Sequence, residues 1–364
     1  MTDEKDIAAV FELGGRVREL RPFGHGLINN TYLLTTDTDR RVILQRINRR
    51  VLPRPDLISE NLHILTNHVV EKMTSTGTGM HALKFPEILR THDGKSFFLD
   101  AAGEYWRAMS FIENTFTLEK ITTLNQAEEV GHVLGRFHAL ICDLNPKQLH
   151  ETLPGFHNAA NRLARFMQTS HRGAPEKAEW RYCFSFIESR QALASVLESA
   201  KREGMLFLRA IHGDTKLNNF LFDVNSGKAV SLVDLDTIQP GLIHFDIGDC
   251  LRSCANTAGE SPTDIETVYF DFDICHALLK SYLAETQSFL TRHDYRFLYD
   301  SIRLIPFELG MRFLTDHLEG NRHFRTDWPG QNLHRAMVQF RLTESIENSE
   351  KRIRSLIDEL SPGV

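Results

Sequence analysis

The stretch at residues 211–236 constrains this chain most, because polar side chains alternate there with two short apolar runs. The runs at 220–222 and 230–233 are rich in residues that favour strands, and an Asn-Ser-Gly turn signal separates them. This pattern predicts a β-hairpin. Because the two strands of a hairpin run antiparallel, we expect Asn219 and Asp234 to lie near the same end.

Asp214 lies in the polar loop before this hairpin, directly after a His-Gly pair. Oxygen atoms of Asn219 and Asp234 would suit Mg²⁺, a hard cation that also keeps phosphates and waters in its shell. Asp214 would then serve as a separate catalytic base for the hydroxyl that accepts a phosphoryl group. The pattern therefore predicts a Mg²⁺–nucleotide phosphotransferase. The alternative is a solvated loop in which Asn219 and Asp234 are turn residues.

The bulk properties exclude several classes of protein. At 364 residues the chain is long enough for two domains or one bilobed unit. Its net charge of −6 argues against a nucleic-acid binder, because such proteins usually carry a basic surface. Its five cysteines are scattered without a CxxC pair, which predicts neither a zinc knuckle nor a disulfide framework. The N-terminus does not resemble a signal peptide, and no run of about eighteen apolar residues occurs. We therefore expect a soluble, cytoplasmic protein with no nucleic-acid or membrane partner.

The first fifty residues read as strands around a glycine-bearing loop. β-Rich segments at 17–21, 31–36 and 41–47 flank the loop at 23–30. Glycines allow close backbone approach there, and exposed N–H groups can meet nucleotide phosphates. No Walker A pattern occurs, and the loop does not open a helix as a Rossmann fingerprint would. The loop residues that we expect to bind the nucleotide are Gly24, His25, Gly26 and Asn29.

A kinase-like lobe places a cation on its third strand and a helical glutamate facing it. Here the third strand ends in Leu-Gln-Arg-Ile, without a lysine. Arg46 is the only cation in that half of the strand, and Gln45 faces the other side by alternation. An amphipathic helix is expected at 55–70, and Glu60 near its start is the natural partner for Arg46. The alternative is that both are surface charges.

A second hairpin, at 97–99 and 105–111, leads into a predicted hinge between two lobes. Backbone groups at this hinge could meet the adenine edge, so we expect Phe111 and Glu113 at the nucleotide. The resulting division is a nucleotide-binding lobe at 1–112 and a catalytic, acceptor-binding lobe at 113–364.

Beyond about residue 126 the apolar residues follow the period of helices, except in the central hairpin. Pro306 is expected to kink or break the helix that contains it. Further helices are expected at 178–203, 267–289, 295–318 and 331–360.

Several stretches together carry a resemblance to a known family. The chain resembles the aminoglycoside phosphotransferase and choline kinase superfamily over residues 24–340, and within it the bacterial N-acetylhexosamine 1-kinases. This resemblance implies an α+β, bilobed protein-kinase-like fold with a small antiparallel β N-lobe and a larger, mainly helical C-lobe. The stretches that carry it are GHGLINNTY (24–32), VILQRIN (42–48), HGDTKLNN (212–219), VDLDTIQPG (233–241) and ELGMRFLTDHLEG (308–320).

The resemblance also implies roles for further residues. Asp236 would assist at the metal or at an acceptor hydroxyl, and Asp246 would brace the catalytic loop. Arg312 and Asp316 are four positions apart and hence on one helix face, where the resemblance places contacts to the hexosamine. The alternative for that pair is an intrahelical ion pair. ATP would be the phosphoryl donor and Mg²⁺ the cofactor.

Two departures from protein kinases argue against a protein substrate. Gly213 stands where protein kinases carry an arginine, and only eleven residues, 235–245, separate Asp234 from Asp246. That spacing leaves no room for an activation segment. We expect ATP-dependent phosphorylation of the anomeric hydroxyl of N-acetylglucosamine or N-acetylgalactosamine. Choline, homoserine, another sugar or an aminoglycoside remain alternative acceptors, and a non-catalytic nucleotide-binding protein remains an alternative function. The sequence leaves open the C4 epimer, the donor nucleotide and the oligomeric state.

Overall fold

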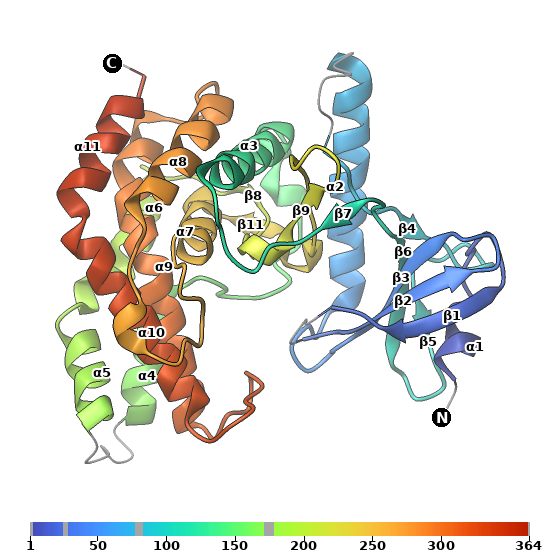
Figure 1. The fold of residues 1–364 in the computed structure, drawn as a ribbon, viewed down its shortest axis with the longest axis horizontal. Coiled ribbons are helices and arrows are strands. Elements are labelled where there is room, and N and C mark those ends of the chain that lie inside the picture. The colour runs from blue at the N-terminus through green and yellow to red at the C-terminus, as the bar shows by residue number, and fades with distance from the viewer. Residues whose placement is uncertain (1–2, 25–27, 77–82, 171–177, 363–364) are drawn as a thin grey trace.

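A small antiparallel sheet lies at one end of the long axis of the computed structural model, and a larger helical part fills the other (Figure 1). We call these parts the small lobe and the large lobe. The structure describes residues 3–24, 28–76, 83–170 and 178–362. The predicted α+β class, with a small antiparallel sheet beside a larger helical part, is confirmed.

The small-lobe sheet has six strands in the described ranges, in the order β1-β2-β3-β6-β4, with β5 paired to β6. Its strands are β1 (Val17–Pro22), β2 (Asn30–Thr36), β3 (Arg41–Ile47), β4 (Ile88–Leu89), β5 (Phe98–Leu99) and β6 (Tyr105–Ser110). The short helix α1 (Glu4–Ala8) covers one face. There Ile7 and Phe11 pack with Val42 and Leu44 of β3 in a core of their own.

Helix α2 (Pro55–Thr76) stands between the sheet and the large lobe (Figure 1). Its apolar stripe, which includes Leu62 and Leu65, lies in the same hydrophobic core as Val130 and Phe137 of the large lobe. The predicted helix is therefore confirmed. It links the two lobes through shared apolar packing, which is the main source of stability for such a helix.

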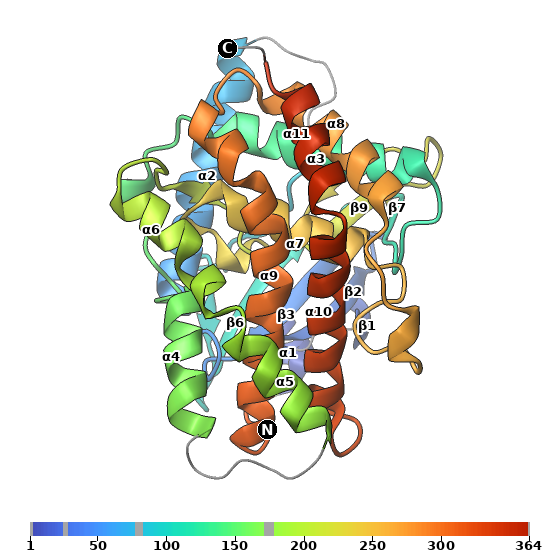
Figure 2. The ribbon, with the colours of Figure 1, turned by 90° about the vertical axis from the view of Figure 1, so that its left-hand side faces the viewer.

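The large lobe consists mainly of helices. They are α3 (Leu124–Ile141), α4 (Ala159–Ser170), α5 (Ala178–Glu188), α6 (Val196–Arg202), α7 (Ile243–Cys254), α8 (Phe272–Thr286), α9 (Arg292–Leu318), α10 (Gln331–Asn348) and α11 (Glu350–Leu360). Figure 2 shows α9 and α10 side by side. Helices α3 and α8 approach so closely that a Cβ at Gly131 would lie 2.3 Å from the carbonyl oxygen of Leu278. Among the described helices, none has both the length and the apolar character to cross a bilayer.

The large lobe also contains short strands and 3₁₀ turns. They are β7 (Thr115–Phe116), β8 (Arg209–Ile211), β9 (Phe220–Asp223), β10 (Ala229–Leu232) and β11 (Gln239–Gly241), with η1 (Pro146–Gln148), η2 (Gln191–Ser195), η3 (Leu217–Asn219), η4 (Leu235–Thr237) and η5 (Ile265–Thr267). β9 and β10 form the predicted hairpin. The backbone N–H of Val233 donates to the carbonyl oxygen of Asn219 at 2.9 Å, so Asn219 and Asp234 do lie at the same end.

Helix α9 continues through Pro306, so the proline does not break it, and the kink stays a prediction. Two other helix predictions were wrong in detail. The single helix expected at 178–203 is interrupted where Arg190 leaves the helical conformation and pairs with Glu347 at 2.8 Å. The helix expected at 331–360 is likewise divided, into α10 and α11.

Candidate active site

The loop that carries Asp214 follows β8 and is shaped by a glycine. Gly213 has a φ of +86°, and a Cβ there would lie 2.8 Å from the carbonyl oxygen of Thr237. Both the backbone conformation and the lack of space therefore require glycine. Thr237 Oγ1 also donates a hydrogen bond to the carbonyl oxygen of His212 at 2.7 Å. The loop is thus held against η4, the turn that directly follows Asp234.

Asp246, near the N-terminus of α7, braces this loop from behind. Its carboxylate accepts hydrogen bonds from the backbone N–H groups of His212 and Gly213, both at 2.7 Å. It also lies 2.9 Å from His138 Nε2, and the other ring nitrogen of His138 is 3.0 Å from the Tyr282 hydroxyl. Burial would raise the pKa of Asp246, but the His138 hydrogen bond and charge lower it. The geometry matches the bracing role predicted for Asp246.

Asp214 lies beside a cation that the sequence prediction did not include. Lys216 Nζ is 2.5 Å from Asp214 Oδ2. Burial would raise the pKa of Asp214, but the charge of Lys216 lowers it. Asn219 Nδ2 donates to the carbonyl oxygen of Asp214 at 2.7 Å and to Oδ2 at 3.3 Å. Since its nitrogen faces Asp214, the amide oxygen of Asn219 is available to a ligand on its other side.

Asp234 has the features of an incomplete cation site. It adopts a left-handed conformation with φ +66°, which is uncommon for a residue other than glycine and concentrates at functional sites. Within the described residues its carboxylate makes no hydrogen bond or ion pair. Desolvation and the negative charge of Asp236 raise the pKa of Asp234 to about 6. A divalent cation would relieve both effects.

The ligand set of this site fits Mg²⁺ better than a metal held entirely by protein. In the described ranges, no group of three or more His, Cys, Asp or Glu side chains is arranged to hold a metal. Asn219 and Asp234 offer one amide oxygen and one carboxylate. Mg²⁺ is commonly held by one or two carboxylates, with substrate phosphates and waters completing its shell.

Asp236 connects the two lobes across the cleft. It is 4% exposed, and its carboxylate forms an ion pair with Arg107 of β6, which is 3% exposed. Its other oxygen accepts a hydrogen bond from Asn29 Nδ2 at 2.9 Å. Asn29 Oδ1 in turn accepts from the backbone N–H of Asn48 at 3.0 Å. Both oxygens of Asp236 are thus bound to the small lobe.

The structure corrects the predicted Arg46–Glu60 pair. Arg46 lies over the ring of Trp106, 5.8 Å from its centroid, on the sheet face that packs against α1. Glu60 pairs with His150 at 2.7 Å instead, so the two predicted partners do not meet within the described part of the chain. Gln45 and Arg46 do face opposite sides of the sheet, as predicted, but the prediction that Arg46 is the one facing the cleft was wrong. Gln45 is the residue turned toward the large lobe.

The predicted nucleotide loop is described only in part. Gly24 has a φ of +76°, which requires a glycine or a strained residue. His25 and Gly26 lie outside the described residues. Asn29 is placed at the cleft, where it contacts Asp236 as given above. Nucleotide contacts of this loop stay a prediction.

Phe111 and Glu113 lie at the junction of the lobes, as the predicted hinge requires. Phe111 packs edge-to-face on Phe23, with ring centroids 5.8 Å apart. Arg41 lies over Phe111 at 4.4 Å and forms an ion pair with Glu113. Asn114 follows with φ +58°, a left-handed turn that redirects the chain into the large lobe. The Glu113 side chain is therefore bound to β3, while the backbone remains the predicted adenine contact.

Asp316 and Arg312 do not form the intrahelical ion pair that was considered. Both oxygens of Asp316 accept hydrogen bonds, from Asn332 Nδ2 and from three backbone N–H groups of the loop after α9, at 2.8–3.0 Å. Asp316 therefore shapes that loop and has no oxygen left for a sugar. One of the three groups belongs to Phe324, whose ring centroid lies 5.5 Å from Arg312 Cζ. Asp316 thus positions Phe324 against Arg312.

A buried polar cluster lies next to the catalytic loop. His157 Nε2 is 3.0 Å from the carbonyl oxygen of Gly213, and His157 Nδ1 is 3.4 Å from Glu308 Oε2. Burial would lower the pKa of His157, but the bond to Glu308 raises it. Arg162 Nε lies 3.8 Å from Glu308 Oε1, and both buried atoms lack a hydrogen-bond partner within the described part of the chain. Arg312 lies over Phe156, beside this cluster, with 5.4 Å from Cζ to the ring centroid.

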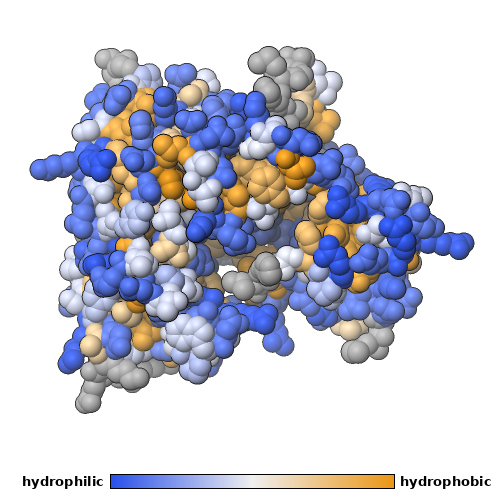
Figure 3. Space-filling view, viewed as in Figure 1, coloured by the Kyte–Doolittle hydropathy of each residue, from blue (hydrophilic) through white to orange (hydrophobic). Residues whose placement is uncertain are grey.

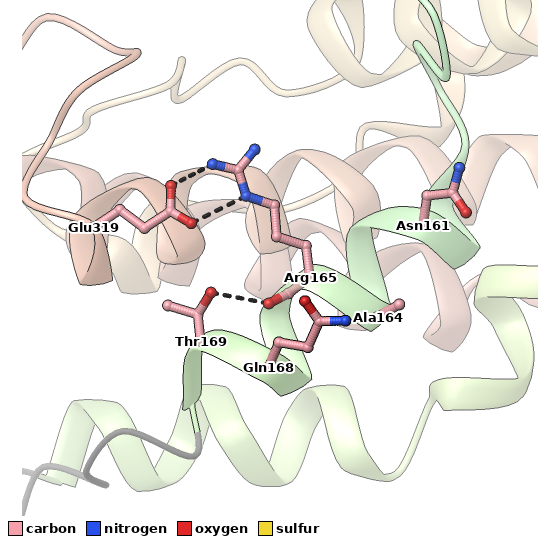
Figure 4. A pocket seen from close by; sticks show the side chains of 6 residues that line it. All are labelled: Asn161, Ala164, Arg165, Gln168, Thr169 and Glu319. Atoms are coloured by element: carbon pink, nitrogen blue, oxygen red, sulfur yellow. Dashed lines mark hydrogen bonds and ion pairs between the residues drawn. The ribbon is translucent and has the colours of Figure 1, made fainter.

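The surface is hollowed between the two lobes (Figure 3). A separate pocket of about 490 Å³ opens between α4 and the end of α9, where Arg165 pairs with Glu319 (Figure 4). No residue of the predicted catalytic set lines this pocket. Its lining residues are Asn161, Ala164, Arg165, Gln168, Thr169 and Glu319.

Sequence reasoning missed several residues of the site. Lys216 had a signal, since it stands two positions after Asp214 inside the motif. Arg107 could have been found by pairing strands β3 and β6 and asking which faces match. Glu308 opens the stretch 308–320 that carries the resemblance, but its contact with His157 had no sequence signal, because the two residues are far apart in the chain and meet only in the fold.

Comparison with known proteins identifies the family and the fold of this chain. The sequence profile described as the phosphotransferase enzyme family matches residues 19–274. Among solved structures, the chain is similar to a microcompartment-associated aminopropanol kinase, with a TM-score of 0.64, 16% identity and coverage of 96% of this chain and 98% of that one. It is also similar to an aminoglycoside phosphotransferase from Alicyclobacillus acidocaldarius, with a TM-score of 0.59, 13% identity and coverage of 99% and 97%.

A third similar structure is an ethanolamine kinase from Plasmodium vivax, with a TM-score of 0.55, 13% identity and coverage of 88% of this chain and 82% of that one. At these identities the likeness establishes a shared fold. The family profile spans the small-lobe strands, the catalytic loop and the metal-site candidates in one continuous match. The chain therefore belongs to the phosphotransferase enzyme family.

Proposed function

We propose that this protein is an ATP- and Mg²⁺-dependent kinase that phosphorylates the anomeric hydroxyl of an N-acetylhexosamine. The observation that carries the kinase reaction is the meeting of Asp214, Asn219 and Asp234 at one end of a braced loop and hairpin. Asp214 has a lowered pKa and a lysine neighbour, while the Asp234 carboxylate makes no hydrogen bond or ion pair with the described residues.

In the proposed reaction each residue has a separate task. Asp214 orients the acceptor hydroxyl and takes its proton late, since phosphoryl transfer passes through a loose transition state. A weakly basic carboxylate suits that late transfer. Asn219 and Asp234 would hold Mg²⁺, which neutralises charge on the transferred group when bound. Lys216 adds a fixed positive charge beside Asp214.

The two lobes would divide these tasks near residue 112. The small-lobe sheet ends at Ser110, and Phe111 and Glu113 form the crossing. The small lobe, with Gly24, His25, Gly26 and Asn29 in its loop, would cover the phosphates and exclude water. The large lobe would carry the catalytic and acceptor groups.

The charges beside the catalytic loop support a neutral acceptor. There the cations Arg162 and Arg312 face the carboxylates of Glu308 and Asp249, so the charges are balanced. Such a balance gives no preference to an ammonium group. Hydroxyl and acetamido groups of a neutral sugar could instead bond to Arg162 Nε and Glu308 Oε1, which have no hydrogen-bond partner among the described residues. Arg312 would contact the sugar, and Asp316 would act through the loop that it shapes.

Structures of similar fold support the donor and the metal. An amicoumacin kinase was solved in complex with AMP-PNP and Ca²⁺, and aminoglycoside 2'-phosphotransferase-IIIa was solved with GDP. A nucleotide and a divalent cation are therefore compatible with this fold. No nucleic-acid, membrane or protein substrate is proposed.

The test is ADP release from Mg²⁺-ATP with a panel of acceptors. The panel contains N-acetylglucosamine, N-acetylgalactosamine, glucose, choline, homoserine and kanamycin. We expect turnover with the N-acetylated sugars, an acid-labile sugar 1-phosphate as product, and loss of activity with EDTA that excess Mg²⁺ restores. Turnover with choline or kanamycin instead would refute the acceptor assignment and keep the kinase reaction. Nucleotide binding without turnover on any acceptor would favour the non-catalytic alternative.

A further inference from the structure

The cleft-facing side of the small-lobe sheet carries a buried arginine that the proposed reaction has not used. In the antiparallel pairing of β3 and β6, Gln45 is opposite Arg107, and Arg46 is opposite Trp106. Opposite residues share a face, and neighbours along a strand alternate. Trp106 packs in the core beneath α1. Gln45 and Arg107 therefore share the other face, which is turned toward the large lobe.

The place of a strand lysine is thus taken by a neutral amide. In a kinase-like lobe the third strand supplies the cation that meets the phosphates. Here Gln45 stands on the cleft face of β3, and its Oε1 accepts hydrogen bonds from Arg107 Nε at 3.0 Å and Nη2 at 2.6 Å. Its Nε2 donates to Thr31 Oγ1 at 3.1 Å, which fixes the amide orientation. Gln45 therefore orients the guanidinium of Arg107, which lies on the adjacent strand β6.

The carboxylate that pairs with this cation also differs from the one in a kinase-like lobe. The usual partner of the strand cation is a glutamate on the helix that follows. On α2, Glu60 turns to His150, and the inward polar residue is Asn61, whose Nδ2 donates to the carbonyl oxygen of Ile238 at 2.8 Å. Arg107 pairs instead with Asp236 of the large lobe. The ion pair therefore spans the cleft, two positions from Asp234.

Arg107 retains bonding capacity in this arrangement. A guanidinium carries five N–H donors in a planar fork that matches phosphate oxygens. The bonds to Gln45 and Asp236 use Nε and Nη2, and in the described part of the chain Nη1 has no hydrogen-bond partner. We propose that Arg107 is the cation that binds the nucleotide phosphates, held in position by Gln45 and Asp236. This inference rests on the proposed nucleotide-dependent function.

The experiment is calorimetric titration of a non-hydrolysable ATP analogue with Mg²⁺, which requires no turnover. We expect Arg107→Gln to weaken binding about tenfold to a hundredfold, the range for losing a charge-assisted hydrogen bond. The matched variant is Arg46→Gln, an arginine one position away in register on the opposite face. Wild-type binding by Arg107→Gln, with weakened binding by Arg46→Gln, would overturn the assignment.

A charge-relocation variant separates phosphate binding from a structural role. Gln45→Lys combined with Arg107→Gln returns the cation to β3 but does not restore the original bond to Asp236. We expect this double variant to recover most of the lost affinity. If it does not, and Asp236→Asn lowers the unfolding temperature as much as Arg107→Gln, the pair is structural and the inference fails. If the wild-type protein binds neither ATP nor GTP with Mg²⁺, the proposed function itself fails.

Discussion

The two sides of the cleft are built differently. On the large-lobe side, Asp246 fixes the catalytic loop from behind through two backbone N–H groups, and His138 fixes Asp246. On the small-lobe side, Asn29 and Arg107 reach across to one carboxylate, Asp236. The proposed catalytic groups are therefore preorganised by buried contacts within the large lobe, whereas these polar contacts of the small-lobe side run between the two lobes.

The difference between the two sides of the cleft is tested most strongly by a substitution of Asp214. We expect Asp214→Asn to lower kcat about 10²–10⁴-fold, the usual contribution of a general base, because the amide has no basic oxygen for the acceptor proton. Steady-state kinetics with the best acceptor of the panel measure this. Nucleotide affinity should stay near that of the wild type, since the brace at Asp246 is intact. A variant with normal turnover would remove Asp214 from the role of base.

Breaking the brace should affect stability rather than chemistry alone. Asp246→Ala leaves His138 and the backbone N–H groups of His212 and Gly213 buried without their acceptor. We expect a loss of about 3–5 kcal/mol in the free energy of unfolding, measured with urea. The control is Asp358→Ala on the exposed face of α11, which should change it by less than about 0.5 kcal/mol. Equal effects of the two substitutions would show that the large-lobe side is not preorganised by Asp246.

The buried His157–Glu308 contact should make large-lobe stability depend on pH. The pKa of His157 is raised in the folded protein, so its contribution is complete below its ordinary pKa near 6.5 and is lost as pH rises through the folded value. His157→Gln should therefore be less stable than the wild type by about 1.5–3 kcal/mol at low pH.

The difference in the free energy of unfolding between the wild type and His157→Gln should become smaller above neutral pH. Urea unfolding of both proteins from pH 5.5 to pH 9 measures it. A gap that stays constant over this range would mean that His157 does not titrate in the folded protein. Both proteins retain Asp249, because its charge also raises the pKa of His157.

The smallest effect is expected on the surface of the small lobe. Arg18 pairs with Asp39 at 2.7 Å, but the two side chains are 53% and 78% exposed. Exposed pairs contribute about 0.2–1 kcal/mol, because water screens them and both side chains lose freedom. Arg18→Gln should therefore change the free energy of unfolding within that range and leave nucleotide affinity unaltered. A larger loss would mean that the small lobe depends on surface charge more than the large lobe does.

Local patterns were predictable because the physics behind them is local. The hairpin of β9 and β10 follows from two strand-forming runs and a turn, and it brings Asn219 and Asp234 together without help from the rest of the chain. The strands β1 to β3 and the helix α2 were found for the same reason. Helix ends were less predictable, since tertiary contacts such as Arg190 with Glu347 decide where α5 stops.

Contacts between distant segments could not be read in the same way. Alternation along β3 showed that Gln45 and Arg46 face opposite sides, but only packing against α1 decided which side meets the cleft. The same holds for Asp316, whose place on α9 suggested a sugar contact. Its oxygens are in fact bound by the loop that follows α9.

The sequence by itself determined the loop of Asp214 and the hairpin that brings Asn219 and Asp234 to one end, because neighbouring residues specify them, and the resemblance of several stretches to a family implied the α+β class. Only the tertiary structure decided which cation faces Asp236, and which buried groups adjoin Gly213. Arg107 is 129 residues from Asp236, and His157 is 56 residues from Gly213. Such contacts depend on how the lobes and helices pack, and no short stretch of chain encodes that packing.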